Sequence, residues 1–169
     1  MPNELEELTL RQMPYSPVSE QAVLGAILGD PRCVADIIDK LRPEDFYIQK
    51  NREIFETIHT MFSYSRTIDP VTVLEALKQN GYDRDGQAWD YFLQLMDNTP
   101  PGYNVDEYIG FIKDKALLRQ IAGTAGELLS MVQGGTDSGQ TVLDAAEQRI
   151  YAIRQGRTSR GLTPIADVI

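Results

Sequence analysis

The segment VDEYIGFIKDKALLRQIAGTAGELLSMV, residues 105–132, decides the fold class of this chain. Its apolar residues recur at intervals of three and four with only glycines interrupting, so the pattern predicts a single helix about 40 Å long. Asn104 followed by Glu107 is typical of a capping-box start. The apolar stripe of this helix is wide and comprises Tyr108, Ile109, Ile112, Ala116, Leu117, Ile121, Ala125, Leu128, Leu129 and Val132.

A stripe of this width needs more cover than one short partner helix provides. An uncovered apolar surface of such a size usually marks a protein interface. The alternative is that another part of the same chain folds back over the stripe. Periodicity alone leaves both explanations open.

The loop GGTDSGQ, residues 134–140, ends this helix, and a second helix is predicted from about 141 to 155. Its apolar side carries Val142, Ala146, Ile150 and Ile153. Two helices joined by a short loop pack antiparallel. Residues 104–155 therefore predict a long antiparallel helical hairpin.

Residues 16–97 predict a compact helical head. Asp30-Pro31 and Asp69-Pro70 each supply an N-cap followed by a first-turn proline, and the first of these opens a helix predicted to run to Leu41. Gly81 is placed to close the helix that starts at Pro70 in a left-handed conformation. Because no segment alternates with period two, we expect an all-α fold.

One helix of the head contains SEQAVLGAIL, residues 19–28, in which small residues gather on one face. Ala22, Gly25 and Ala26 are spaced by three and four, and a glycine costs about 1 kcal/mol in a helix relative to alanine. The expected compensation is the close packing of another helix against this face.

Composition describes a folded domain, with 42% hydrophobic and 24% charged residues in a chain of 169. The net charge of −9 repels phosphate backbones and argues against a principal nucleic-acid binder. The single cysteine, Cys33, predicts a packed core thiol, and the single histidine, His59, predicts a partly buried structural side chain.

No motif of a catalytic site occurs in the sequence. No glycine precedes a lysine, which excludes a phosphate-binding loop of the G-x-x-x-x-G-K-S/T type, and no Cys/His cluster or G-x-S-x-G element is present. Glu44-Asp45 and Asp106-Glu107 fall at predicted helix starts, where they complement the helix dipole. We expect no catalytic, cofactor-binding or metal site in these residues.

Targeting signals are also absent from the sequence. There is no run of about 18 apolar residues, and the first ten residues, MPNELEELTL, are acidic. These features predict a cytoplasmic location without membrane contact.

A run of basic side chains near the C-terminus is the exception to the acidic balance. Arg149, Arg154, Arg157 and Arg160 have no acidic residue among them. A solvated linker is the common meaning of such a run. The alternative function for the whole chain is a stand-alone helical domain that binds single-stranded nucleic acid through these arginines.

Seven stretches of the chain, in order and in register, resemble the N-terminal domain of DnaB-type replicative DNA helicases, over about 130 residues. They are SEQAVLGAIL (19–28), LRPEDFY (41–47), NREIFETI (51–58), IDPVTV (68–73), the Asn-Thr-Pro turn (98–100), YIGFIKDKALLRQ (108–120) and AEQRIY (146–151). Two positions depart from the family pattern. The family usually has a histidine where this chain has Asn51, and a glycine pair where it has Gly86-Gln87.

The resemblance implies that the chain is the front part of a longer polypeptide, whose remainder holds a RecA-like motor with its ATP and magnesium and makes most of the DNA contacts. Residues 1–15 are then a flexible N-terminal segment. Residues 156–169, which overlap the stretch QGRTSRG (155–161), are a linker and the start of a linker helix that begins near Thr163-Pro164.

In this family the N-terminal domains form a collar, a trimer of dimers paired through the helical hairpins. The resemblance implies an oligomer interface that includes Tyr108, Ile109, Ile112, Leu117, Ile150 and Ile153. The collar also receives the C-terminal domain of DnaG-type primase and, in many bacteria, responds to a helicase loader. The positions that match the primase contacts are Tyr91, Ile121 and Leu128.

Overall fold

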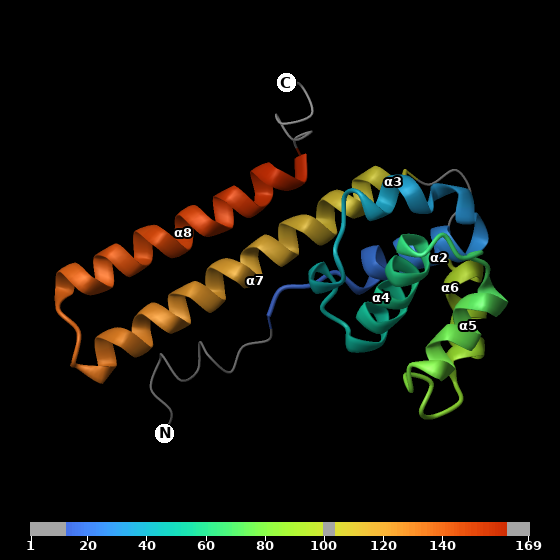
Figure 1. Cartoon of the computed structure of the whole chain (residues 1–169), viewed down its shortest axis with the longest axis horizontal. Coiled ribbons are helices and arrows are strands. Elements are labelled where there is room, and N and C mark those ends of the chain that lie inside the picture. The colour runs from blue at the N-terminus through green and yellow to red at the C-terminus, as the bar shows by residue number, and fades with distance from the viewer. Residues whose placement is uncertain (1–12, 100–103, 162–169) are drawn as a thin grey trace.

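The structure is a computed structural model that describes residues 13–99 and 104–161, with side chains described up to residue 156. All regular elements in the described ranges are helical, so the predicted all-α class is confirmed. Figure 1 shows a compact head from which a long two-helix hairpin projects. The elements are α2 (Pro17–Gly29), η1 (Pro31–Cys33), α3 (Val34–Ile38), η2 (Pro43–Asp45), α4 (Gln49–Ser63), α5 (Pro70–Gln79), α6 (Ala88–Asp97), α7 (Val105–Gly134) and α8 (Gly139–Gly161).

Helix α2 lies at the centre of the head, and nearly all of its side chains are buried. It packs against both α6 and α7. A Cβ atom at Gly25 would overlap the side chain of Thr99 and the carbonyl group of Leu95. The predicted close packing against the small-residue face of α2 is therefore confirmed, and the partner is α6.

Helix ends in the head follow the sequence signals. Asp69 accepts a hydrogen bond from Thr72 N at 2.8 Å and caps α5. Gly81 closes α5 with a φ of 74°, while Tyr82 N donates to Leu77 O, which confirms the predicted left-handed residue. The helix predicted to run from Pro31 to Leu41 is instead split into η1 and α3 and ends at Ile38.

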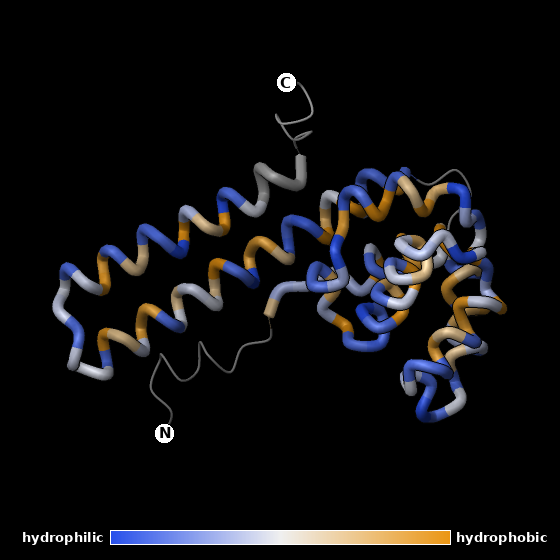
Figure 2. The backbone as a smooth tube through the Cα atoms, in the orientation of Figure 1, coloured by the Kyte–Doolittle hydropathy of each residue, from blue (hydrophilic) through white to orange (hydrophobic). Residues whose placement is uncertain are grey.

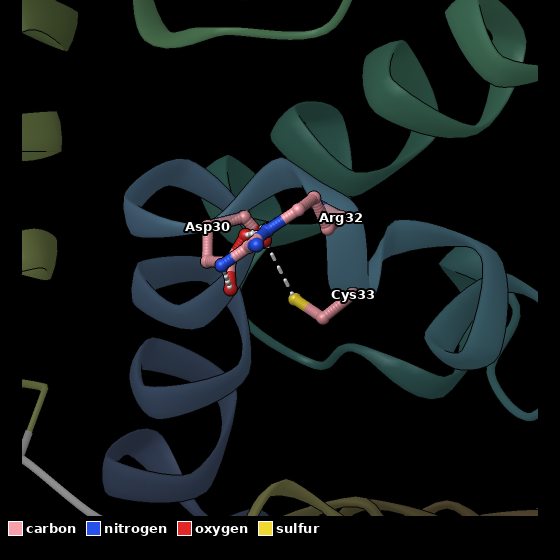
Figure 3. A network of polar contacts seen from close by, with 3 residues as sticks. All are labelled: Asp30, Arg32 and Cys33. Carbon is pink, nitrogen blue, oxygen red and sulfur yellow. Dashed lines mark hydrogen bonds and ion pairs between the residues drawn. The ribbon is translucent and has the colours of Figure 1, made fainter.

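The turn between α2 and α3 holds the single cysteine (Figure 3). Asp30 accepts hydrogen bonds from Arg32 N and Arg32 Nε, and the Cys33 thiol donates to Asp30 O at 3.0 Å. Cys33 is half-buried against the core, and this burial raises the pKa of its thiol. The predicted core thiol therefore packs against the core but lies at its edge, half-buried. His59 is likewise partly buried, with its ring 6.4 Å from that of Phe55.

Helix α7 belongs to both parts of the molecule. Ile109, Ile112 and Ala116 are buried in the core of the head, under α2. Beyond the head, α7 packs along α8, and the two helices lie side by side in Figure 1. The wide apolar stripe of α7 is thus only partly covered by the chain itself, because the head covers one side of α7 and leaves another side exposed.

The hairpin differs from its predicted limits at the C-terminal end. Helix α8 runs to Gly161, so residues 156–161, predicted as linker, are helical. Thr163-Pro164 and residues 1–12 lie outside the described residues. Of the predicted flexible segment 1–15, the described part contacts the head and α7 through Pro14 and Tyr15. None of the described helices has the length and apolarity to cross a bilayer.

Candidate protein interaction surfaces

One side of α7 carries a regular apolar stripe, which we call the α7 seam and define as Phe111, Leu118, Ile121, Ala125, Leu128 and Val132. Leu128 is half-buried, and the other five are exposed. Phe111, Leu118, Ala125 and Val132 are spaced by seven residues, and so are Ile121 and Leu128. A seven-residue apolar repeat is the spacing by which two helices pack along one another. Figure 2 shows hydrophobic segments recurring along the hairpin beyond the head.

Helix α8 continues this apolar character. Leu143 and Ile150 are also seven residues apart, and both are exposed. Ala146, Glu147, Ile150, Tyr151 and Arg154 line a shallow hollow of about 400 Å³. Arg149 Nε lies 2.6 Å from Glu127 Oε2 and ties α8 to α7 on the side away from this hollow. This ion pair ties the two helices together, and Leu143 and Ile150 remain exposed on α8.

The predicted interface residues divide into two groups. Ile109 and Ile112 are core residues of the head, which corrects their assignment to an oligomer interface, because α2 already covers them. Tyr108 also packs against this core. Leu117 and Ile153 are half-buried, and Ile150 is exposed.

Two exposed apolar residues of α7, Phe111 and Leu118, are not among the predicted interface positions. Both are more than two-fifths exposed. They share a seven-residue spacing with Ala125 and Val132, but Ile109 and Ala116 have the same spacing and are buried, so the spacing alone does not separate the two sets.

The head carries a second surface, a cleft of about 450 Å³ between the start of α4, the end of α5 and the loop before α6. Ile54, Leu77 and Ala88 give it an apolar floor, and Lys50, Glu53, Asp83 and Arg84 are among the charged groups around it. Tyr91 forms one wall, with the Lys50 ammonium 3.7 Å from its ring centroid. Burial raises the pKa of Tyr91 to about 12, and its hydroxyl donates to Asn51 Oδ1.

The three positions matched to primase contacts do not form one patch. Tyr91 lies in the head cleft, whereas Ile121 is exposed and Leu128 half-buried on the α7 seam. Helix α6 and the distal part of α7 lie at opposite ends of the molecule in Figure 1. Any single partner that contacts all three residues of one chain has to span the head.

Two other kinds of site, a metal site and a nucleic-acid site on the arginine run, can be compared with the structure. In the described ranges no group of His, Cys, Asp and Glu side chains is placed to hold a metal ion. Of the arginine run, Arg149 is bonded to Glu127, and the side chains of Arg157 and Arg160 lie outside the described residues. Arg154 lines the hollow on α8.

Comparison with known families settles the relationship that the sequence motifs suggest. The model of the DnaB-like helicase N-terminal domain matches residues 12–114, more than half of the chain. The chain belongs to this family. The match runs from the segment before α2 to the first third of α7, which is the part of α7 that completes the core of the head.

The relatives of this chain are replicative DNA helicases that are longer than it. It is 30% identical over 154 residues to replicative DNA helicase DnaB of Pasteurella multocida, a match that covers 89% of this chain and 32% of the relative. It is 28% identical over 161 residues to replicative DNA helicase DnaB of Mycobacterium leprae, covering 94% of this chain and 27% of the relative. The chain thus spans about a third or less of these relatives.

Solved structures support the same family. The N-terminal domain of DnaB helicase from Mycobacterium tuberculosis superposes with a TM-score of 0.76 at 28% identity, covering 83% of this chain and 99% of that domain. The corresponding domain from Helicobacter pylori, described together with its interactions with primase, has a TM-score of 0.57 at 20% identity, covering 78% of this chain and 99% of that domain. The second likeness concerns the fold alone.

Proposed function

We propose that this chain is the N-terminal collar part of a hexameric, ATP-dependent replicative DNA helicase, and that it mediates assembly and docking and carries out no catalysis. The remainder of the polypeptide would hold the motor, with its ATP and magnesium, and make most of the DNA contacts. The replicative helicases related to this chain, which are about three times as long or longer, support this division.

The observation that carries the proposal is the uncovered α7 seam. Its residues lie at seven-residue spacings, and four of them, Phe111, Leu118, Ile121 and Val132, are large and exposed. When a second helix covers such an apolar stripe, the burial stabilises the pair of helices. We propose that two copies pair through their hairpins and that three such dimers form a collar.

Docking of the C-terminal domain of a DnaG-type primase is the second part of the proposal. Ile121 and Leu128 on the seam and Tyr91 in the head cleft are the proposed contact positions. The related Helicobacter pylori domain, whose structure was described with its primase interactions, supports this choice of partner. A helicase loader is a further proposed partner of the same collar.

The absolute mass of the purified chain, measured by light scattering over a wide concentration range, tests self-association. We expect a dimer or hexamer for the wild type. Leu118→Asp and Ile121→Asp should weaken pairing by about thirtyfold or more, because a charge at the centre of an apolar seam costs about 2 kcal/mol or more.

The matched control is Leu93→Asp on α6. Leu93, Leu118 and Ile121 are each 42% exposed, so each substitution replaces an apolar side chain of similar exposure by a charge. Leu93→Asp should leave the mass unchanged. A wild-type chain that stays monomeric at every concentration, or an equal response of all three variants, contradicts pairing through the seam.

Titration with the C-terminal domain of primase, followed by calorimetry, tests docking separately. Leu128→Asp should reduce the affinity at least tenfold, while Leu93→Asp should not. Equal affinities for the wild type and Leu128→Asp would remove the seam from the docking surface and leave the head cleft as the remaining proposed contact.

A further inference from the structure

A network of buried polar groups crosses the head from the cleft toward α7. The Tyr91 hydroxyl, at the cleft, donates to Asn51 Oδ1. Asn51 Nδ2 in turn donates to Glu20 Oε1 at 3.2 Å. The carboxylate of Glu20 also accepts from Tyr47 N at 3.1 Å and from Ile48 N at 3.2 Å. Side chains of α6, α4 and α2 are thus joined to the backbone that precedes α4.

That backbone, the segment 45–48, is also held from α7. Arg119 donates to Asp45 O at 2.7 Å and to Pro14 O at 2.9 Å, and its guanidinium lies 5.3 Å from the centroid of the Tyr47 ring. Arg52 of α4 donates to the next carbonyl, Phe46 O, at 3.0 Å. The segment 45–48 is therefore the junction between the head network and the middle of α7.

The members of this network have little freedom to change partners. Asn51 is 0% exposed and Glu20 is 1% exposed, so neither can exchange a lost hydrogen bond for one to bulk water. Both oxygens of Glu20 are occupied by donors from Asn51 and the segment 45–48. Removing one hydroxyl at the cleft end leaves an unsatisfied acceptor on Asn51, which favours rearrangement of its neighbours.

The α7 end of the network, Arg119, is next in sequence to the seam residue Leu118 but lies about 100° around the helix from it. Phe111 lies in the part of α7 that the head covers on its other side. Pairing along the seam therefore uses the stretch of α7 that the head holds in place through Ile112 and Ala116. If the head were loosely held on α7, pairing would have to order it, and the entropy cost of this ordering would weaken the association.

We propose that Tyr91 is a positioning residue for hairpin pairing: through Asn51, Glu20 and the segment 45–48 it fixes the contacts of Arg119, and thereby strengthens the association of two copies. This proposal rests on the proposed function, because it concerns the regulation of the same seam. It assigns to a residue of the head cleft an effect on a surface that it does not touch.

A double-mutant cycle on the full chain tests the proposal, with the dissociation constant of pairing measured by analytical ultracentrifugation. Tyr91→Phe should raise this constant about threefold to tenfold. Arg119→Lys should have an effect of similar size, because lysine lacks the second donor arm that holds two carbonyl groups. The double variant should be little worse than either single variant, since both substitutions break one network.

Tyr82→Phe provides the control. Tyr82 lines the same cleft, but its hydroxyl pairs with the surface carboxylate of Glu56 at 3.2 Å and is no member of the network. Its removal should leave pairing unchanged. A wild-type dissociation constant for Tyr91→Phe, or effects of Tyr91→Phe and Arg119→Lys that multiply independently, overturns the proposal.

Amide hydrogen exchange at Tyr47 and Ile48 separates this proposal from the proposed function. Tyr91→Phe should accelerate exchange at both amides, because both donate to Glu20, whereas Tyr82→Phe should not. A monomeric wild-type chain contradicts pairing and with it the regulatory effect, even if exchange is accelerated. Unchanged exchange in Tyr91→Phe overturns the network whatever the mass of the chain.

Discussion

Gly25 of α2 and Leu95 of α6 are in direct contact, and the contact excludes any side chain at position 25. A Cβ atom built there would overlap the carbonyl group of Leu95 and the hydroxyl of Thr99. The Thr99 hydroxyl itself donates to Leu95 O at 2.8 Å, so the neighbouring groups are already bonded to each other. The approach of α2 to α6 therefore depends on the absence of a single methyl group.

Gly25→Ala should destabilise the chain by about 1–3 kcal/mol, although alanine favours helix more than glycine does, because the added methyl group forces the two helices apart. Urea unfolding followed by circular dichroism measures the effect. Gly126→Ala in α7 is the control, since nothing lies within 4 Å of a Cβ atom there, and it should stabilise by up to about 1 kcal/mol. Equal responses of the two variants would contradict the close contact.

Ser65, which follows α4, has a φ of 54°, a conformation that costs side chains about 1 kcal/mol. Ser65→Gly should therefore raise the free energy of unfolding by about 1 kcal/mol. Ser63→Gly should lower it, because Ser63 is still helical and its hydroxyl donates to His59 O at 2.9 Å. Thermal unfolding of the two variants should shift the midpoint in opposite directions, and a common direction would refute the argument.

The pH dependence of stability above pH 10 should change in Tyr91→Phe. Burial raises the pKa of Tyr91 in the folded chain to about 12, against 10 for an ordinary tyrosine. The folded state thus holds a proton that the unfolded state releases, so this contribution to stability is complete below pH 10 and is lost as the pH rises toward 12. Chemical unfolding at several pH values should show a shallower decline for Tyr91→Phe than for the wild type, and parallel declines for the two chains would contradict the argument.

Single-stranded DNA should bind the chain weakly and without dependence on Arg149. This side chain is engaged by Glu127, and the net charge of −9 repels phosphate. Fluorescence anisotropy at two salt concentrations should give the same affinity for the wild type and for Arg149→Gln. A strong, salt-dependent affinity that is lost in Arg149→Gln would favour the alternative function as a nucleic-acid-binding domain.

Local signals in the sequence were sufficient for the helices and several of their ends. Apolar periodicity located the helices, and the left-handed Gly81 and the tight face at Gly25 followed from the preferences of single residues. Periodicity of 3.6 residues does not say which neighbour covers which side of a helix. The resemblance implied that Ile109 and Ile112 lie at an interface, and periodicity alone could not show that the head covers them.

The polar network could not be predicted from the sequence. Arg119 and Glu20 bond mainly to backbone groups of segments distant along the chain, and such bonds leave no periodic pattern. The one signal was Asn51, where the chain departs from the family pattern. Asn51 is fully buried between Glu20 and Tyr91, so the departure marks the centre of the network.

The sharing of α7 between head and hairpin has a consequence for synthesis on the ribosome. The core of the head is incomplete until Ile109, Ile112 and Ala116 have been added, although α2 to α6 precede them in the chain. At about 5–20 residues per second, the first twelve residues of α7 take roughly half a second to two and a half seconds to make. During that interval the emerging head exposes the apolar flank of α2, and its folding has to wait for a helix that extends well outside it.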